Sequence, residues 1–574
     1  MTAGIEVTGT VTTENTGTEN VGSGNMSMGK WVKSGAPWVW LNAAAVGVSL
    51  LLVIGLLTLI AGRGMGHFWP AAVYEVVYED HQGQRTRLAG QITQREQVTA
   101  ERLLESGILV AEGVETVERI LLKTGNRELG GEDFRWILEP GILRQTKPLS
   151  FAVLEREEWG TFFGRVIGLK QDGQVLESKD VWSDFQLKLA RAADLREQVR
   201  KLEKGDIGAA NYRIEKLRLR ERRLQLDGVT DKAPYDELNR RREGFQAEYL
   251  HLEEQLTGLS GAINRDIVIM QTSDGTEVEL PLYTVIDAWQ PNSMSGLEHV
   301  GHYFRKVWAF ITDDPREANT EGGIYPAIFG TILMVLLMTV VVTPFGVIAG
   351  VYLKEYARQR LLTRIIRIAV NNLAGVPSIV YGVFGLGFFV YTLGGSIDRL
   401  FFEEALPSPT FGTGGLFWAS ITMALLTLPV VIVSTEEGLA RIPLSIREGS
   451  LALGATQWET LWRTVIPMAS PGIMTGLILA VARAAGEVAP LMLVGVVKLA
   501  PSLPLDSNYP FFHPERKFMH LGFHIYDVGF QSPNVEAVRP LVYATALLLI
   551  IVILLLNMVA IHIRNRLREK YRGL

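Results

Sequence analysis

The chain has 574 residues, of which 48% are hydrophobic and 20% are charged. This composition is too apolar for an ordinary soluble protein and too charged for a chain that lies wholly in a bilayer, so we expect a mixture of membrane and aqueous domains. The net charge of −5 argues against general nucleic-acid binding, and the absence of cysteine excludes disulfides and thiolate metal sites. No Gly-x4-Gly-Lys-Ser/Thr phosphate loop is present, so we expect a chain that is not an ATPase and has no cofactor.

The first part of the chain divides into a polar tail and one apolar helix. Residues 1–36 are rich in Gly, Thr, Ser and Asn, which predicts a disordered tail. Residues 37–62 carry no charge and are long enough to span a bilayer, which predicts the first transmembrane helix. A cleaved signal peptide would have a shorter apolar region nearer the start of the chain.

Residues 63–320 are aqueous in character and predict an α+β domain. Strand pairs are expected at 119–138 and 267–286. Between them, residues 184–259 are dense in Lys, Arg, Glu and Leu, which predicts a helical hairpin or a short coiled coil. A solvated helical pair without a partner is favoured over a binding function for this hairpin.

Residues 321–574 contain five further apolar segments. Each is long enough to span a bilayer, so together with the first helix they predict an all-α polytopic membrane domain of six transmembrane helices. The expected segments are 322–352, 368–397, 405–435, 471–497 and 541–563.

The charges of the short loops predict the orientation of these helices. The loop 354–367 holds five basic residues and one acidic residue, and the carboxyl-terminal tail, residues 564–572, has the same balance. Both segments are therefore expected to face the cytoplasm. With six spans, both termini then lie inside and residues 63–320 lie outside.

Residues 447–472 predict two short helices, which are too short to span a bilayer and are therefore expected at its surface. The first contains Glu448 and Gly449, and a turn is expected at Gly454. Pro467 is expected to end the second helix. The apolar face of that second helix is predicted to consist of Trp458, Leu461, Trp462 and Val465.

This stretch resembles the coupling loop of binding-protein-dependent ABC transporter permeases. In that family a Glu-Ala-Ala triplet is followed by three residues, a glycine, nine residues and an apolar-x-apolar-Pro ending. Glu448, Gly454 and Pro467 keep that spacing, whereas Gly449 departs from the commonest letter. The resemblance implies that the loop docks into a groove on a separate ATPase subunit, with Trp458 anchoring it. An ordinary amphipathic hairpin is the alternative.

Two further motifs are similar to the PstA family of phosphate-specific transport permeases. They are Val-Pro-Ser-Ile-Val-Tyr-Gly at 376–382 and Gly-Glu-Val-Ala-Pro-Leu at 486–491. The similarity covers the five carboxyl-terminal spans, whereas the long insert after the first helix departs from the compact members of the family. It implies a type I ABC importer permease in the bacterial inner membrane. The implied partners are a PstC-like permease, two PstB-like ATPase subunits and a periplasmic PstS-like phosphate-binding protein.

Arg483 and Glu487 are the only charges in the predicted span 471–497. We expect Arg483 near mid-bilayer, where a charge costs roughly 2.5–3.5 kcal/mol. A spacing of four residues lets the two groups pair on one helical face. The hypothesis is that Arg483 meets the phosphate oxyanion in transit and that Glu487 holds Arg483 in place. The alternative is an ion pair that fixes helix packing.

Pro377 and Ser378 lie at a break in the third predicted span and are expected to be a feature of the pore. Proline has no backbone donor, so a carbonyl that it leaves free must find a partner in protein or water. A plain kink that serves helix packing is the alternative.

The sequence therefore predicts a permease subunit that forms half of the pore of an ATP-driven phosphate importer. A permease for another oxyanion, such as molybdate or sulfate, is an alternative of the same class. A membrane-anchored sensor or scaffold would have one or two spans and a cytoplasmic output domain, and an autonomous channel would have no coupling loop. The sequence does not indicate the role of residues 63–320 or the stoichiometry.

Overall fold

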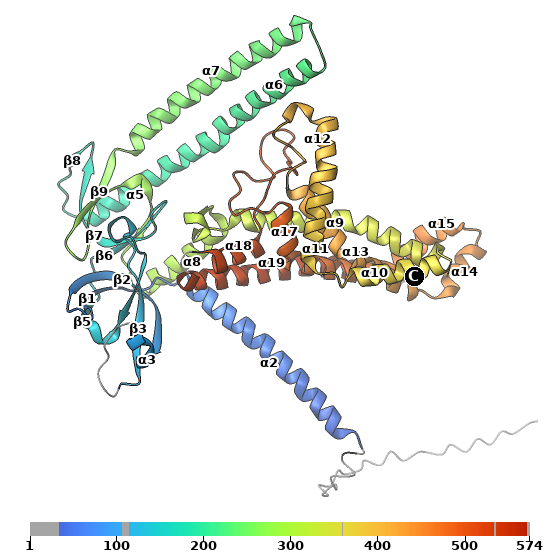
Figure 1. Cartoon of the computed structure of the whole chain (residues 1–574), viewed down its shortest axis with the longest axis horizontal. Helices are drawn as coiled ribbons and strands as arrows, with labels where there is room; N and C mark the ends of the chain where they lie inside the picture. The colour runs from blue at the N-terminus through green and yellow to red at the C-terminus, as the bar shows by residue number, and fades with distance from the viewer. Residues whose placement is uncertain (1–31, 33, 106–113, 359, 533–534, 571–574) are drawn as a thin grey trace, which may run out of the picture. The chain divides into compact units, whose positions relative to one another are not determined.

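The computed structural model describes residues 32–570, except residues 33, 106–113, 359 and 533–534 (Figure 1). The chain divides into two units, residues 1–59 and 60–574. The predicted disordered tail, residues 1–36, lies almost entirely outside the described residues.

Six helices in the described part of the chain are long and apolar enough to cross a membrane, which confirms the predicted number. Their bounds are Pro37–Gly66, Tyr325–Tyr356, Ser378–Phe401, Leu416–Ala440, Gln457–Gly486 and Val538–Lys570. Several are built from consecutive helical pieces. The main pieces are α2 (Ala36–Gly66), α9 (Tyr325–Val351), α11 (Ser378–Phe384), α12 (Gly395–Phe401), α13 (Leu416–Ala440), α15 (Gln457–Thr460), α16 (Ile466–Gly486) and α19 (Val535–Lys570). Shorter or surface helices in the same region are α10 (Leu361–Leu373), α14 (Leu444–Ala452), α17 (Ala489–Val494) and α18 (Leu521–Tyr526).

The third span begins later than predicted, at Ser378 rather than at residue 368. The residues before it form the separate helix α10, which ends at Leu373. Pro377 then directly precedes α11. Proline disfavours helical backbone in the residue before it, so two helices form where one uncharged run predicts a single span.

The fifth span differs from its predicted bounds, 471–497, at both ends. The helical backbone continues from Gln457 through Pro467, so the prediction that Pro467 ends the second surface helix is wrong. Pro467 instead occupies the first turn of α16. A proline is tolerated in the first turn of an α-helix because its missing N–H has no partner within that helix. The preceding turn, Leu461–Val465, is a π-helical turn. At the other end, the helix stops at Gly486.

Helix α13 lies at the centre of the membrane domain and packs against α9 and α16. Small residues allow these close approaches. A Cβ on Gly346 of α9 would lie 2.6 Å from Val431 Cγ1, and one on Gly472 of α16 would lie 2.8 Å from the Cα of Gly438. Close backbone contact at small residues is the usual way in which helices associate in a bilayer, where lipid is as apolar as the side chains.

The described part of the insert between α2 and α9 contains two large antiparallel sheets and one small two-stranded sheet (Figure 1). The first has the order β4-β3-β2-β1-β5 and the second has the order β10-β9-β7-β6-β11, with β8 beside β7. Both predicted strand pairs are present, as β3 with β4 and as β9 with β10. The strands are β1 (Val73–Glu79), β2 (Arg85–Thr99), β3 (Thr116–Lys123), β4 (Phe134–Leu138), β5 (Ile142–Thr146), β6 (Phe151–Arg156), β7 (Phe162–Gln171), β8 (Gln174–Val175), β9 (Asp266–Gln271), β10 (Glu277–Pro281) and β11 (Val285–Trp289).

Helix α5 (Val181–Arg200) covers one face of the second sheet. Phe185 and Leu189 of α5 are buried against Phe162 and Met270 of the sheet. The chain then continues through a π-helical turn, Lys201–Ile207, into α6.

Helices α6 (Gly208–Leu226) and α7 (Lys232–Ile263) run side by side as a long antiparallel hairpin (Figure 1). Ion pairs join the two arms, among them Arg213 with Glu248 at 3.0 Å. Helix α8 (Gly296–Thr312) follows the second sheet, and the short strands β12 (Pro315–Arg316) and β13 (Glu321–Gly322) connect it to α9. The remaining short helices of the insert are α3 (Ala100–Glu105) and α4 (Arg127–Gly130).

Candidate coupling loop and translocation pathway

Side-chain hydrogen bonds cap helix α15, which begins the fifth span, and join it to the surface helix α14. The hydroxyl of Thr456 accepts a hydrogen bond of 3.2 Å from the backbone N–H of Glu459, and the Glu459 carboxylate accepts one of 3.0 Å from the N–H of Thr456. This reciprocal capping box satisfies two N–H groups at the start of α15. The hydroxyls of Ser450 and Thr460 lie 2.9 Å apart and join α14 to α15. The surface helix α14 is therefore braced against the start of the fifth span.

Gly454 forms the turn that the sequence predicts between these helices. Its backbone φ is +90°, a conformation that strains a residue with a side chain. Gly449 lies inside α14, and a Cβ on either glycine would have no heavy atom within 4 Å. Only Gly454 is therefore required by backbone conformation. Glu448 is exposed on α14, where a partner protein could reach its carboxylate.

The four apolar residues predicted to form one face differ in burial. Leu461 and Val465 are buried, whereas the side chains of Trp458 and Trp462 are 61% and 60% exposed. The two indole rings stack on each other with centroids 5.8 Å apart. Residues four apart share a helical stripe, so the aliphatic pair and the aromatic pair form two neighbouring stripes, and only the aliphatic one faces the core. The tryptophans leave an aromatic surface uncovered.

Arg447 connects this loop to the end of the second span, and the sequence analysis did not single it out. Its guanidinium donates a hydrogen bond of 2.8 Å to the carboxylate of Glu355 and another of 2.9 Å to the carbonyl of Leu439. Glu355 is the one acidic residue of the basic loop 354–367, which is the signal that could have identified the pair. A cavity of about 170 Å³ adjoins this pair and is smaller than usual small-molecule sites.

Arg483 and Glu487 form the predicted pair, but with a different geometry. Arg483 Nε lies 3.6 Å from Glu487 Oε1, which is an ion-pair distance too long for a hydrogen bond. Because α16 ends at Gly486, Glu487 has extended backbone and lies beyond the last helical turn. The span extends back to Gln457, and Arg483 lies in the last turn of α16. The position of Arg483 near mid-bilayer stays a prediction. Both side chains are partly exposed, at 33% for Arg483 and 23% for Glu487.

Pro377 and Ser378 lie at the junction between α10 and α11. The hydroxyl of Tyr381 donates a hydrogen bond of 2.6 Å to the carbonyl of Leu373 at the end of α10. This contact gives a carbonyl freed at the break a partner within the protein, as the sequence argument requires. Pro377 itself is exposed.

The structure brings the segments that hold the two candidate pathway pairs together. A Cβ on Gly382 of α11 would lie 2.6 Å from the Cα of Pro490 in α17. Within the described residues, no hydrogen bond or ion pair joins Pro377 or Ser378 to the Arg483–Glu487 pair. The same residues contain no group of three or more His, Asp or Glu side chains placed to hold a metal ion.

Comparison with known proteins decides the family. Residues 342–572 match the family model described as binding-protein-dependent transport system inner membrane component. The chain is 35% identical over 243 residues to phosphate transport system permease protein PstA 1 of Mycobacterium tuberculosis, covering 42% of this chain and 71% of that relative. The chain belongs to the PstA-type family of ABC importer permeases. A second PstA relative, from Yersinia pestis, is 34% identical over 253 residues, covering 44% of this chain and 76% of that protein.

As a PstA-type permease, the chain has the type I importer fold with six apolar helices and is a multi-pass inner-membrane protein. Such permeases are transporter subunits rather than enzymes, and they work with ATPase and substrate-binding partners. A solved structure of the MetNI methionine ABC transporter in inward-facing conformations aligns at 19% identity, covering 42% of this chain and 96% of that chain, with a TM-score of 0.30. The family match includes residues 447–472 and Arg483, whereas the insert lies outside it.

Proposed function

We propose that this PstA-type permease forms half of the translocation pore of an ATP-driven phosphate importer, together with a PstC-like permease. The observation that carries the proposal is the similarity to phosphate transport system permeases, at 34–35% identity over more than two thirds of their length. Arg483 supplies a partly exposed guanidinium, whose forked donors match the oxygens of phosphate. In this proposal Glu487 orients Arg483, and Pro377 and Ser378 belong to the neighbouring wall of the pathway.

The coupling stretch 447–472 is the proposed docking element for a PstB-like ATPase. Glu448 and the stacked pair Trp458 and Trp462 offer an exposed acidic and aromatic surface to that partner. The capping box, the turn at Gly454 and the Arg447–Glu355 pair make the loop stiff. A stiff element transmits motion that a flexible loop would absorb, which is the physical requirement for coupling.

We propose that both termini and the coupling loop face the cytoplasm and that the insert lies on the periplasmic side. The contacts of the insert support this arrangement. Arg223 of α6 pairs at 2.8 Å with Glu404 in the loop after the third span, and Lys216 donates to the carbonyl of Tyr509 between the fifth and sixth spans. With six spans, both of those loops lie on the side of the insert. Residue Glu355, which contacts the coupling loop, lies at the opposite end of the second span.

Phosphate uptake tests this function against another oxyanion. The chain and its partner subunits are expressed in cells that lack their own high-affinity phosphate importer, and uptake of radiolabelled phosphate is measured. We expect saturable phosphate uptake that excess molybdate and excess sulfate do not inhibit. Uptake of molybdate or sulfate in place of phosphate would overturn the assignment in favour of the alternative.

A further inference from the structure

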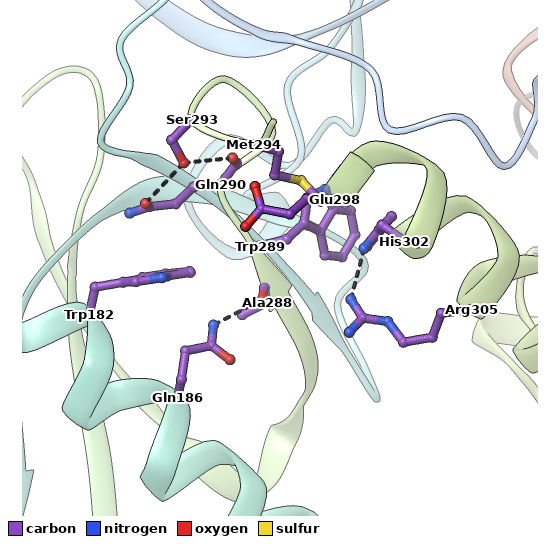
Figure 2. Close-up of a pocket in the computed structure, with 11 residues that line it drawn as sticks. Trp182, Gln186, Ala288, Trp289, Gln290, Ser293, Met294, Glu298, His302 and Arg305 are labelled. Carbon is purple, nitrogen blue, oxygen red and sulfur yellow. Dashed lines mark hydrogen bonds between the residues drawn. The ribbon is translucent and has the colours of Figure 1, made fainter. Parts of the chain in front are cut away.

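A cavity of about 460 Å³ lies in the insert, away from the coupling loop and from Arg483. Its walls come from the start of α5, the end of β11 and the first turns of α8 (Figure 2). Small-molecule sites in proteins commonly enclose about 300–1,000 Å³, so this cavity is large enough for a ligand. The family match does not include this part of the chain.

Two tryptophans are the largest apolar side chains among the residues that line the cavity. Trp182 projects from α5, and Trp289 projects from the end of β11 on the other side of the cavity (Figure 2). The ring of Trp289 packs against the ring of His302, with centroids 4.6 Å apart, and the ammonium group of Lys306 lies 4.4 Å from the centroid of the indole. Indole rings held in this way are flat, rigid surfaces on which a ligand ring can stack.

The polar side chains of the cavity include both donors and acceptors. Gln186 uses its Nε2 to donate a 3.0 Å hydrogen bond to the carbonyl of Ala288, which leaves its Oε1 as an acceptor. Arg305 donates to Nδ1 of His302 at 2.8 Å, so the ring proton of a neutral His302 is on Nε2. Burial and the positive charge of Lys306 lower the pKa of His302 to about 4, so the ring is neutral at physiological pH. Glu298 adds a carboxylate at the rim.

This set of groups narrows the chemistry of the ligand. Asp287 pairs with Arg305 at 3.5 Å and with Lys306 at 2.9 Å, so the positive charges nearest the cavity are already balanced and do not favour a phosphate or another small anion. A purely apolar ligand would displace water from the free Oε1 of Gln186 without replacing its hydrogen bond, which is costly. A pyranose ring fits both features, because its hydroxyls donate and accept hydrogen bonds while its C–H face stacks on indole.

We propose that this cavity is a saccharide-binding site, in which Trp182 stacks on a pyranose ring and Gln186 accepts a hydrogen bond from one of its hydroxyls. Two sources share this chemistry: N-acetylated glycan of the cell wall and unsubstituted glucan. The site would give the permease a contact with glycan that is independent of phosphate transport.

Calorimetric titration of the full-length protein tests this site. The protein is placed in lipid nanodiscs, since alkyl maltoside detergents carry sugar rings themselves. The probes are tri-N-acetylchitotriose and laminaritriose, each at millimolar concentration, which detects even weak binding. We expect at least one probe to bind, with a Kd that Trp182→Ala raises about tenfold or more, since an aromatic anchor in a site is often worth over 1 kcal/mol. Binding of the first probe alone identifies cell-wall glycan, and binding of the second alone identifies glucan.

The matched control is Leu187→Ala. Leu187 follows Gln186 on α5, is 69% exposed and does not line the cavity, so its loss should leave the Kd unchanged. Because Trp182 also contacts the core residue Phe185, Gln186→Leu provides a second variant that should weaken binding without opening the core. The proposal is overturned if neither probe binds, or if the wild type and both site variants bind equally. Neither outcome depends on phosphate transport, so this experiment tests the saccharide site independently of the proposed importer function.

Discussion

Arg447 and Glu355 are 92 residues apart in the chain, and a hydrogen bond of 2.8 Å joins the guanidinium of one to the carboxylate of the other. Each side chain is only 18% exposed, so solvent and salt screen the pair less than a surface ion pair. The contact links the proposed coupling loop directly to the end of the second transmembrane helix. If an ATPase docks on this loop as proposed, a displacement of the loop reaches that helix.

We predict that Arg447→Met uncouples ATP hydrolysis from transport while the complex still assembles. The change removes a partly buried charge-assisted hydrogen bond, worth about 1.5–3 kcal/mol, and leaves Glu355 without this partner. The measurement is the number of phosphate ions transported per ATP hydrolysed. Arg441→Met, at an exposed position before the same loop, is the control and should retain the wild-type ratio. An unchanged ratio in Arg447→Met would show that the Arg447–Glu355 contact does not transmit motion from the loop to the second span.

Gly449 and Gly454 provide a second, matched comparison. Both have open space around a Cβ, but only Gly454 has a positive φ. Gly454→Ala should therefore lower the stability of the loop by about 1–2 kcal/mol through backbone strain. Gly449→Ala should be neutral or stabilising by up to about 1 kcal/mol, because alanine favours a helix interior. Transport and thermal unfolding of the two variants are compared, and equal behaviour would contradict the argument.

The sequence was sufficient to predict features that depend on local pattern. The six apolar segments and the turn at Gly454 follow from hydropathy and from the conformational freedom of glycine. The bounds of the third and fifth spans did not follow, because absence of charge does not show where helical backbone begins. The uncharged segment around Pro377 forms two separate helices, although its composition predicts one span. The segment before Pro467 contains polar residues but belongs to one continuous helix with the fifth span.

The tertiary contacts could not be predicted from the sequence pattern. Arg447 finds its partner 92 residues away, and β6 pairs with β11 across the whole α5–α7 segment. The distinction between the buried Leu461 and the exposed Trp458 depends on which helical stripe meets α13 and its neighbours, and both stripes are apolar. Hydrophobicity alone predicts that Trp458 and Trp462 are core residues. Only the packing of the folded chain shows that they are exposed.

Variants of Arg483 and Glu487 test whether this pair contacts the transported anion or only stabilises helix packing. If Arg483 contacts the anion, Arg483→Ala should leave assembly and ATPase activity intact and reduce phosphate uptake by at least tenfold. The 3.6 Å separation and the partial exposure of Arg483 favour this outcome, since the pair is not a tightly hydrogen-bonded brace. The charge-swapped pair, Arg483→Glu with Glu487→Arg, should not restore uptake. Restored assembly and uptake in that double variant would make the pair structural.

The proposed orientation is tested by cysteine labelling, because the chain contains no cysteine of its own. Glu254→Cys lies at an exposed position on α7, and Ser445→Cys lies at an exposed position on α14. An impermeant maleimide should label Glu254→Cys in intact spheroplasts and label Ser445→Cys only after lysis. The reverse pattern would place the coupling loop outside, where no cytoplasmic ATPase could reach it.

The most direct test of the central claim is ATP-dependent phosphate uptake into proteoliposomes. These contain the chain with its partner permease, the ATPase subunits and the phosphate-binding protein. We predict uptake that requires ATP, that Gly454→Val abolishes and that Gly449→Ala preserves, because only position 454 needs a left-handed backbone. Phosphate uptake without ATP, or full ATP-driven uptake by Gly454→Val, would contradict the assignment of residues 447–472 as the element that couples ATP hydrolysis to transport.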